Sequence, residues 1–181
     1  SQDFGKLRHV LNVLTPGLVY ASNASVYGRA IEASVYGDVT VVLGQGRLEG
    51  RASTPFDEFV ATAPTAQVDE AHAQVGPDTI AKFLFTSGST KLPKGVINTQ
   101  RMMCANQQQI LQCFPVLGEA PPVLVDWLPW NHTFGGNHNV GLTIYNGGTL
   151  YIDDGKPTPA LISETLRNLR EIAPTVYFNV P

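Results

Sequence analysis

The sequence has few of the features that define several protein classes. Only two of its 181 residues are cysteines, Cys104 and Cys113, and their spacing suits neither a disulfide framework nor a zinc site. We therefore expect reduced thiols in a cytoplasmic protein. No apolar run approaches the roughly 18 residues of a membrane span, and no secretory signal opens the chain, so we expect no membrane contact.

Charge is also scarce. Charged residues make up 15% of the chain, and the formal net charge is −3, which leaves no basic face for nucleic acid. Hydrophobic residues make up 43%, which excludes a disordered chain. The four histidines show no metal-ligand spacing. The length fits a single domain of ordinary size.

The most informative segment is residues 85–95, Phe-Thr-Ser-Gly-Ser-Thr-Lys-Leu-Pro-Lys-Gly, which joins two apolar runs. Gly88 and Gly95 permit positive-φ turns that point successive N–H groups into one concavity. Lys94 adds a point charge suited to phosphate. Hydroxyl donors come from Thr86, Ser87, Ser89 and Thr90. The segment therefore predicts a phosphate-binding loop, with an ordinary hairpin turn as the alternative.

The loop is not a Walker P-loop, because Pro-Lys-Gly leads into an expected strand rather than a helix. It resembles the phosphate-binding motif of the adenylate-forming enzymes, Thr-Ser-Gly-Ser/Thr-Thr-Gly-x-Pro-Lys-Gly. Lys91 stands where that family has glycine. If the position needs positive φ, Lys91 strains the loop by about 1–2 kcal/mol; alternatively, its charge helps to hold pyrophosphate.

A second signature is residues 126–138, Asp-Trp-Leu-Pro-Trp-Asn-His-Thr-Phe-Gly-Gly-Asn-His. It resembles the segment in which the same family carries a histidine or aromatic residue beside its carboxylate substrate. The sequence of this segment, together with that of residues 95–99, is most similar to feruloyl-CoA synthases among the acyl-CoA synthetases. His132 follows an expected strand, where open α/β sheets bind ligands. A role as a helix cap is the alternative.

The resemblance implies that an aromatic carboxylic acid is activated by ATP as an acyl adenylate and passed to CoA. The phosphate-binding residues would then be Thr86, Ser87, Gly88, Ser89, Thr90 and Lys94. Mg²⁺ would bridge the phosphates, with the Thr90 hydroxyl in its shell. Lys94 and His132 would be the catalytic residues. The acid pocket beside His132 would be formed by Trp130, Phe134, Gly135, Gly136 and Asn137.

The two adjacent glycines, Gly135 and Gly136, allow two interpretations. They leave space that a side chain would fill, which suits a planar aromatic acid. Equally, they form a turn that frees the following helix.

Apolar periodicity predicts strands that alternate with helices. Ser25 and Thr99 are the expected N-caps of two helices, and residues 61–77 are expected to form a mobile surface connection with a helical turn. Helices are expected over 3–14, 26–35, 55–60, 101–114, 137–145 and 159–172. Strands are expected over 18–21, 39–43, 80–85, 96–98, 123–127, 149–152 and 175–180. The pattern predicts a three-layer α/β fold, with a mostly parallel sheet and helices on both faces.

The resemblance also implies a domain arrangement. Residues 1–181 would be a single α/β fragment of the large N-terminal domain of an AMP-binding enzyme, without the C-terminal domain. Apolar surface exposed by the truncation would favour a homodimer, and the fragment alone would be inactive.

Other function classes compete with this interpretation. They are another acyl-CoA synthetase or adenylation enzyme, a non-catalytic nucleotide-binding module, a serine hydrolase and a purely structural α/β domain. The hydrolase is disfavoured because the chain has no Gly-x-Ser-x-Gly elbow.

Overall fold

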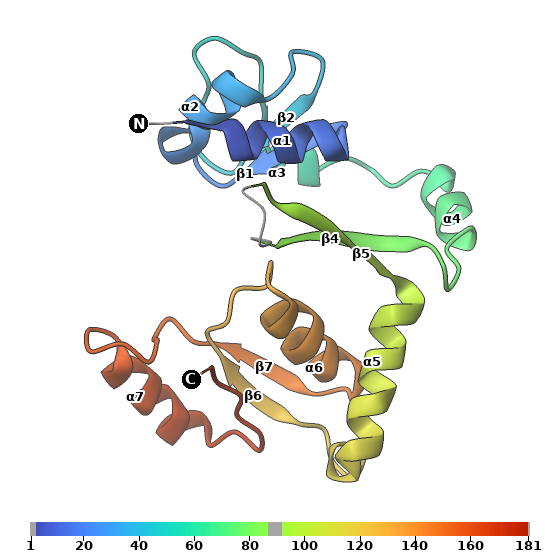
Figure 1. The fold of residues 1–181 in the computed structure, drawn as a ribbon, viewed down its shortest axis with the longest axis vertical. Coiled ribbons are helices and arrows are strands. Elements are labelled where there is room, and N and C mark those ends of the chain that lie inside the picture. The colour runs from blue at the N-terminus through green and yellow to red at the C-terminus, as the bar shows by residue number, and fades with distance from the viewer. Residues whose placement is uncertain (1–2, 87–91, 181) are drawn as a thin grey trace. The chain divides into compact units, whose positions relative to one another are not determined.

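Residues 3–86 and 92–180 are described by the computed structural model shown in Figure 1. The chain divides into two compact units. The first combines Ser1–Val75 with Phe85–Val96, and the second combines Gly76–Leu84 with Ile97–Pro181. Strands β4 (Ile80–Thr86) and β5 (Lys94–Thr99) contribute residues to both units and pair with each other. The expected phosphate loop therefore joins two adjacent strands, as predicted.

The first unit is built around a parallel sheet with the strand order β1-β2-β3. The strands are β1 (Leu18–Ala21), β2 (Thr40–Leu43) and β3 (Thr54–Pro55). Helices α1 (Gly5–Leu14) and α2 (Ala24–Ser34) supply Leu11 and Ile31 to the core. Val41 and Leu43 of β2 complete that core with Val35, and the two β2 side chains are each 2% exposed. Alternation of apolar strands and amphipathic helices produced this unit, as the sequence pattern predicted.

Two further helices follow the sheet of the first unit. Helix α3 (Phe56–Val60) begins directly after Pro55, whose fixed φ suits the start of a helix. Helix α4 (Ala66–Ala73) has no buried residue. The connection predicted over 61–77 is thus at the surface and contains a short helix of its own.

The N-cap of α2 differs from the prediction. Asn23, not Ser25, has the extended backbone of an N-cap residue, and its side-chain oxygen accepts a hydrogen bond from the Ser25 N–H at 2.8 Å. The Ser25 hydroxyl donates to the same oxygen at 2.7 Å. Both residue types favour caps, so composition could not choose between them. The Asn23 amide also donates to Gln45 Oε1 at 3.1 Å.

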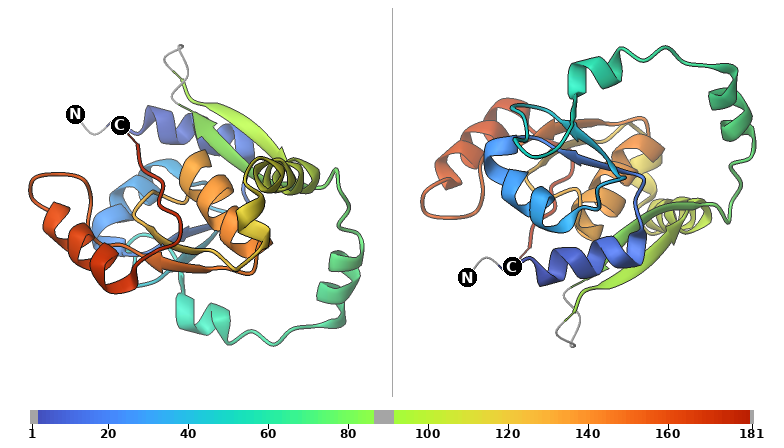
Figure 2. Two further views of the ribbon diagram at one scale, coloured as in Figure 1. Left: turned by 90° about the horizontal axis from the view of Figure 1, so that it is seen from below. Right: turned by 90° about the horizontal axis from the view of Figure 1, so that it is seen from above.

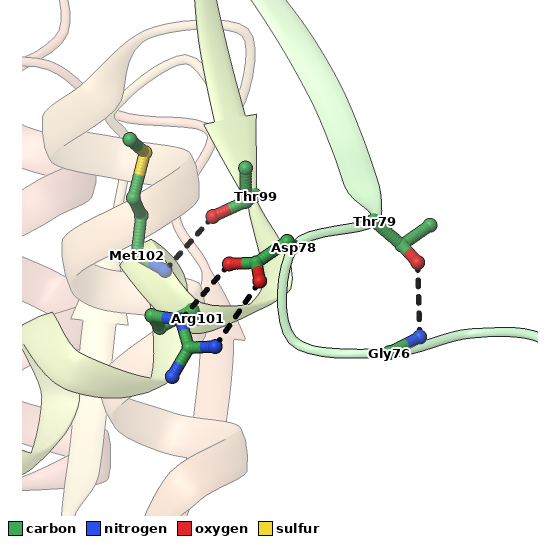
Figure 3. A network of polar contacts seen from close by, with 6 residues as sticks. All are labelled: Gly76, Asp78, Thr79, Thr99, Arg101 and Met102. Carbon is green, nitrogen blue, oxygen red and sulfur yellow. Dashed lines mark hydrogen bonds and ion pairs between the residues drawn. The ribbon is translucent and has the colours of Figure 1, made fainter.

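The second unit begins with a corner between β4 and α5 (Gln100–Cys113), shown in Figure 3. The Gln100 N–H donates to Thr79 O at 3.0 Å, and Thr99 caps α5 by accepting from the Met102 N–H, as predicted. Arg101 donates to Asp78 at 3.0 and 3.2 Å, and this hydrogen-bonded pair lowers the pKa of the Asp78 carboxyl. Both side chains are exposed, so the ion pair contributes little stability.

The remaining strands of the second unit form a parallel pair. Strand β6 (Val123–Asp126) lies beside β7 (Thr149–Ile152) in the register Val123 opposite Thr149. Leu124 and Leu142, 1% and 0% exposed, form a core with Leu117, which lies in a 3₁₀ turn over Pro115–Gly118. Each such leucine contributes about 1.5–3 kcal/mol by leaving water. Helix α5 lies beside α6 (Gly141–Tyr145) in both views of the unit (Figures 1 and 2).

Two predicted elements of this unit are corrected. Residues 175–180 form no strand, because Thr175 and Val176 both direct their N–H groups at the single carbonyl of Val123, so no ladder develops. The helix predicted over 137–145 begins earlier, with a π-helix over Thr133–Val140 that continues into α6. Helix α7 (Ile162–Ile172) is slightly shorter than predicted.

The α/β class with parallel strands and packed helices is confirmed. Among the described residues, the strands form three small sheets of three, two and two strands rather than one. In that same part of the chain, no helix has the length and apolarity that crossing a membrane requires.

The cap of α2 can be tested directly. Replacing Asn23 with alanine removes the acceptor for the Ser25 N–H, and loss of such a cap costs about 1 kcal/mol. We expect Asn23→Ala to lower the midpoint of thermal unfolding clearly more than the neighbouring control Ser25→Ala does. A larger loss in Ser25→Ala would restore the original assignment of the cap.

Candidate functional site

The two ends of the expected phosphate loop lie at the facing ends of paired strands. Thr86 is the last residue of β4, Lys94 is the first of β5, and both are exposed. The residues between them that the sequence assigned to phosphate or metal, Ser87, Gly88, Ser89 and Thr90, lie outside the described residues, as does Lys91. Exposed hydroxyl and ammonium groups at these ends are available to an anion.

Two contacts of the loop flanks were not foreseen. Gly95 does not have the expected positive φ but lies within β5. A Cβ on Gly95 would lie 3.2 Å from the Phe85 ring, so a larger residue there would require the ring to shift slightly. In the first unit, the His9 ring nitrogen Nε2 lies 3.0 Å from the carbonyl oxygen of Pro93. His9 is 84 residues away in sequence, and no local pattern could have revealed this contact.

His132 is the N-cap residue of the π-helix. Its Nδ1 accepts a hydrogen bond from the Phe134 N–H at 3.2 Å. In the neutral ring an accepting Nδ1 leaves the proton on Nε2, which is then a donor. The imidazole is exposed. The capping contact and a role toward a ligand are therefore compatible, since they use different ring nitrogens.

The adjacent glycines after His132 are required by a close approach of the chain to itself. A Cβ on Gly135 would lie 2.5 Å from Pro129 O, and a Cβ on Gly136 would lie 2.1 Å from Trp130 O. Both glycines are buried. Their missing side chains thus allow residues 129–136 to turn tightly into the π-helix, a rare form that occurs frequently at functional sites.

An aromatic cluster surrounds the side chain of His138 on the same π-helix. The ring centroids of His138 and Phe178 are 4.6 Å apart, and those of His138 and Phe134 are 5.1 Å apart, both with edge-to-face geometry. Phe178 lies outside any helix or strand, and the sequence reasoning missed it as a site residue. Trp130, assigned to the pocket wall, is 51% exposed. All three rings of the cluster are half-buried, and Phe178 also packs against the core of Leu117, Leu124 and Leu142.

Asn137 is held by two residues from neighbouring segments. Its Nδ2 donates to Asn98 Oδ1 at 2.7 Å, and its carbonyl oxygen accepts from Gln107 Nε2 at 2.6 Å. Gln107 lies on α5 and is 4% exposed. The Gln107 Oε1 and Asn137 Oδ1 atoms are buried without a hydrogen-bond partner. Such an unpaired oxygen costs about 1–3 kcal/mol, so these amides are poor choices for stability alone.

A buried carboxyl lies behind this segment, at the end of β6. Asp126 is 2% exposed, and its Oδ1 accepts from the Leu128 N–H at 3.0 Å. Burial raises the pKa of this carboxyl, and the nearby Asp153 raises it further, whereas the Leu128 N–H, Asn139 and His138 oppose the rise. Asp153 itself is bonded to Gly155, Thr165 and Asn168 and joins β7 to α7.

The described residues contain no group of three or more His, Cys, Asp or Glu side chains able to hold a metal ion. The oxygen donors expected for Mg²⁺, among them the Thr90 hydroxyl, fall outside those residues.

Comparison with known proteins places the chain in a family. It matches the model described as AMP-binding enzyme over residues 5–181. An octahydro-1H-inden-4-yl propanoyl:CoA ligase from Rhodococcus jostii is 28% identical over 131 residues, covering 69% of this chain and 25% of the ligase. Long-chain-fatty-acid–AMP ligase FadD23 from Mycobacterium tuberculosis is 34% identical over 89 residues, covering 42% of this chain and 15% of FadD23.

The fold has solved counterparts. ATP-bound MatB from Rhodopseudomonas palustris superposes with a TM-score of 0.70 at 22% identity, over 98% of this chain and 32% of MatB. At that identity the likeness concerns the fold. The chain thus spans between about a seventh and a third of the lengths of these three proteins.

The tight turn before the π-helix predicts a steric effect. Alanine at Gly136 would place its Cβ against the Trp130 carbonyl, and overpacking of this kind costs about 1–3 kcal/mol or more. We expect Gly136→Ala to lower the thermal unfolding midpoint strongly. The matched control is Gly37→Ala, since a Cβ there meets nothing within 4 Å. Equal midpoints for the two variants would contradict the turn.

The buried Asp126 predicts a pH dependence. Because its folded pKa is raised above the ordinary value of 3.8, the folded protein binds this proton more tightly than the unfolded chain does. Its contribution to stability therefore falls as pH rises from about the unfolded pKa through the raised folded pKa. Asp126→Asn keeps an oxygen for the Leu128 N–H without the charge. The thermal unfolding midpoint of Asp126→Asn, relative to that of the wild type, should rise between pH 4 and pH 7. A difference between the two midpoints that does not change with pH would contradict this.

Proposed function

Because the chain belongs to the AMP-binding enzyme family, whose model matches residues 5–181, we propose that it is the acid- and phosphate-binding part of an ATP-dependent acid–thiol ligase. The ligase activates an aromatic carboxylic acid of the hydroxycinnamic, ferulate-like type as an acyl adenylate and transfers the acyl group to CoA. The chain is one α/β segment of the large N-terminal domain in this proposal, and the complete reaction belongs to the longer enzyme.

The observation that carries the proposed acid specificity is the aromatic cluster of Phe134, His138 and Phe178, close in sequence to the His132 cap. Edge-to-face aromatic surfaces favour a planar ring in the substrate. His132 exposes an Nε2–H donor suited to a carboxylate. The sequence of residues 128–137, which resembles that of feruloyl-CoA synthases, supports the same class of acid.

In the first half-reaction, a carboxylate oxygen attacks the α-phosphorus of ATP, and pyrophosphate leaves. Negative charge builds on the leaving group, and the Lys94 ammonium is the residue of this chain suited to neutralise it. The hydroxyl and N–H groups of Thr86, Ser87, Gly88, Ser89 and Thr90 hold the phosphates. Mg²⁺, a hard cation that binds oxygen ligands, supplies further charge neutralisation, with the Thr90 hydroxyl as a candidate ligand.

In the second half-reaction, the CoA thiolate attacks the acyl carbonyl, and AMP leaves. The residues of this chain contribute by holding the acyl group: His132 at the carboxylate end, and Trp130, Phe134 and Asn137 along the acid. The close approach at Gly135 and Gly136 sets the direction of the π-helix, which carries Phe134 and Asn137 and begins after its cap residue His132. Alignment of this kind is the main contribution asked of a protein in acyl transfer.

A second candidate is a ligase for an aliphatic acid, because the name of FadD23 describes a long-chain-fatty-acid–AMP ligase. A non-catalytic nucleotide-binding module is a third. The aromatic cluster favours an aromatic acid over an aliphatic one. The presence of both the loop and the His132 segment favours an enzyme over a non-catalytic nucleotide-binding module.

The proposal predicts acid-dependent exchange of pyrophosphate into ATP by the longer enzyme. Ferulate should give a higher kcat/KM than a long-chain fatty acid, and CoA should then give a thioester. Faster exchange with the fatty acid would replace the aromatic acid with the second candidate, and no exchange with any acid would leave the nucleotide-binding module.

Lys94→Ala is the matched test of the loop in the same assay. Removing one well-placed donor to developing charge lowers the rate by about 10²–10³. We expect that loss in exchange, with little change in thioester formation from supplied acyl adenylate. Wild-type exchange by this variant would remove Lys94 from the mechanism.

A further inference from the structure

Gln107 on α5 reaches a backbone carbonyl at the junction of the π-helix and α6. Its Nε2 donates to Asn137 O at 2.6 Å. The Gly141 N–H, which in a regular α-helix would donate to Asn137 O, donates instead to His138 O. The Gln107 amide therefore supplies a donor to the carbonyl at the point where the helix departs from regular geometry.

The glycine at position 141 fits the same contact. A Cβ there would lie 2.5 Å from Gln107 Nε2, and its three nearest atoms would all belong to Gln107. Glycine inside a helix costs about 1 kcal/mol relative to alanine in intrinsic preference. The chain thus carries an unfavourable helix residue where the Gln107 side chain needs room.

Asn98, at the end of β5, holds the side chain of the same residue, because its Oδ1 accepts from Asn137 Nδ2 at 2.7 Å. Asn98 and Gln107 lie on consecutive elements of the second unit and grip Asn137 at its amide and its carbonyl, respectively. Two oxygens of this cluster, Gln107 Oε1 and Asn137 Oδ1, stay without partners. Asn137 is thus held at two of its polar groups by side chains from neighbouring elements, which constrains the π-helix that contains it.

We propose that Gln107, with Asn98, is a positioning residue that fixes the π-helix over Thr133–Val140 and thereby the placement of His132 and Phe134 toward the acid. The inference rests on the adenylation chemistry proposed above, but not on ferulate being the acid. Gln107 touches neither substrate in this role. Its loss acts through the helix, so the acid is affected and ATP is not.

The contact can be separated from its functional consequence by a double substitution in the complete enzyme. Gln107→Ala removes the amide, and Gly141→Ala displaces it, so each single variant should raise KM for the acid. Loss of one neutral hydrogen bond corresponds to a rise of up to about tenfold. The KM for ATP should stay within about twofold of the wild-type value. The acid is the one that the wild type uses best, whichever that is.

The double variant Gln107→Ala, Gly141→Ala gives the decisive comparison. With the amide gone, the three atoms nearest to the new Cβ are removed, and the helix gains alanine. Gly141→Ala should therefore lower the unfolding midpoint of the wild type but raise that of Gln107→Ala. The acid KM of the double variant should nevertheless remain high, because the donor to Asn137 O is still missing. Recovery of the acid KM together with the midpoint would overturn the proposal and leave Gln107 a purely structural residue.

Gln108→Ala is the matched control on the same helix. It removes the 2.6 Å hydrogen bond between Tyr145 and Gln108, another link between α5 and α6 that does not reach Asn137. Its acid KM should equal that of the wild type. A rise equal to that of Gln107→Ala, or an unchanged acid KM in Gln107→Ala, would also overturn the proposal. If the enzyme does not use ferulate, only the proposed acid is contradicted. The role of Gln107 is still tested, because the variants are compared on the acid that the wild type uses.

Discussion

The candidate acid site depends on one close approach, the passage of Gly135 and Gly136 against the carbonyls of Pro129 and Trp130. A side chain at either position would overlap backbone atoms that cannot move independently. Only with both glycines can the chain turn within residues 129–136 and enter the π-helix. The direction of that helix then decides where His132, Phe134 and His138 lie.

As a consequence, several candidate site residues of the second unit come from one short segment. One short segment provides the cap residue His132, whose second ring nitrogen is a donor, and an aromatic surface a turn later. The same segment is fixed from β5 and α5 through Asn98 and Gln107. Asn137, which was predicted to line the pocket, is therefore also tied to β5 and α5.

Asp126 shows how the sheet supports this segment. The carboxyl ends β6 and bonds to the Leu128 N–H, which starts the approach to the turn. Its burial raises its pKa, and the Leu128 N–H and the Asn139 side chain oppose that rise. The sheet thus holds a buried carboxyl directly before the turn that leads into the π-helix.

The sequence by itself determined most of the element order and both signatures. Apolar periodicity identified strands 18–21 and 149–152 with their observed bounds, and Thr99 as the cap of α5, because these depend on neighbouring residues. It also predicted that His132 follows a strand, although β6 ends at Asp126 and His132 caps the π-helix. It misassigned the α2 cap and the last strand, because Asn23 and Ser25 have similar propensities and because ladder pairing of residues 175–180 depends on a distant partner.

Tertiary structure decided the rest. The contacts of Gln107, Phe178 and His9 are with residues far away in the chain, and an amide or a ring has no local pattern that reveals its partner. The π-helix also depends on such contacts, since glycine composition alone is compatible with a loop, a pocket or a turn. Local preference selects helices and strands over a few residues, whereas a close approach between backbones exists only once the chain has folded.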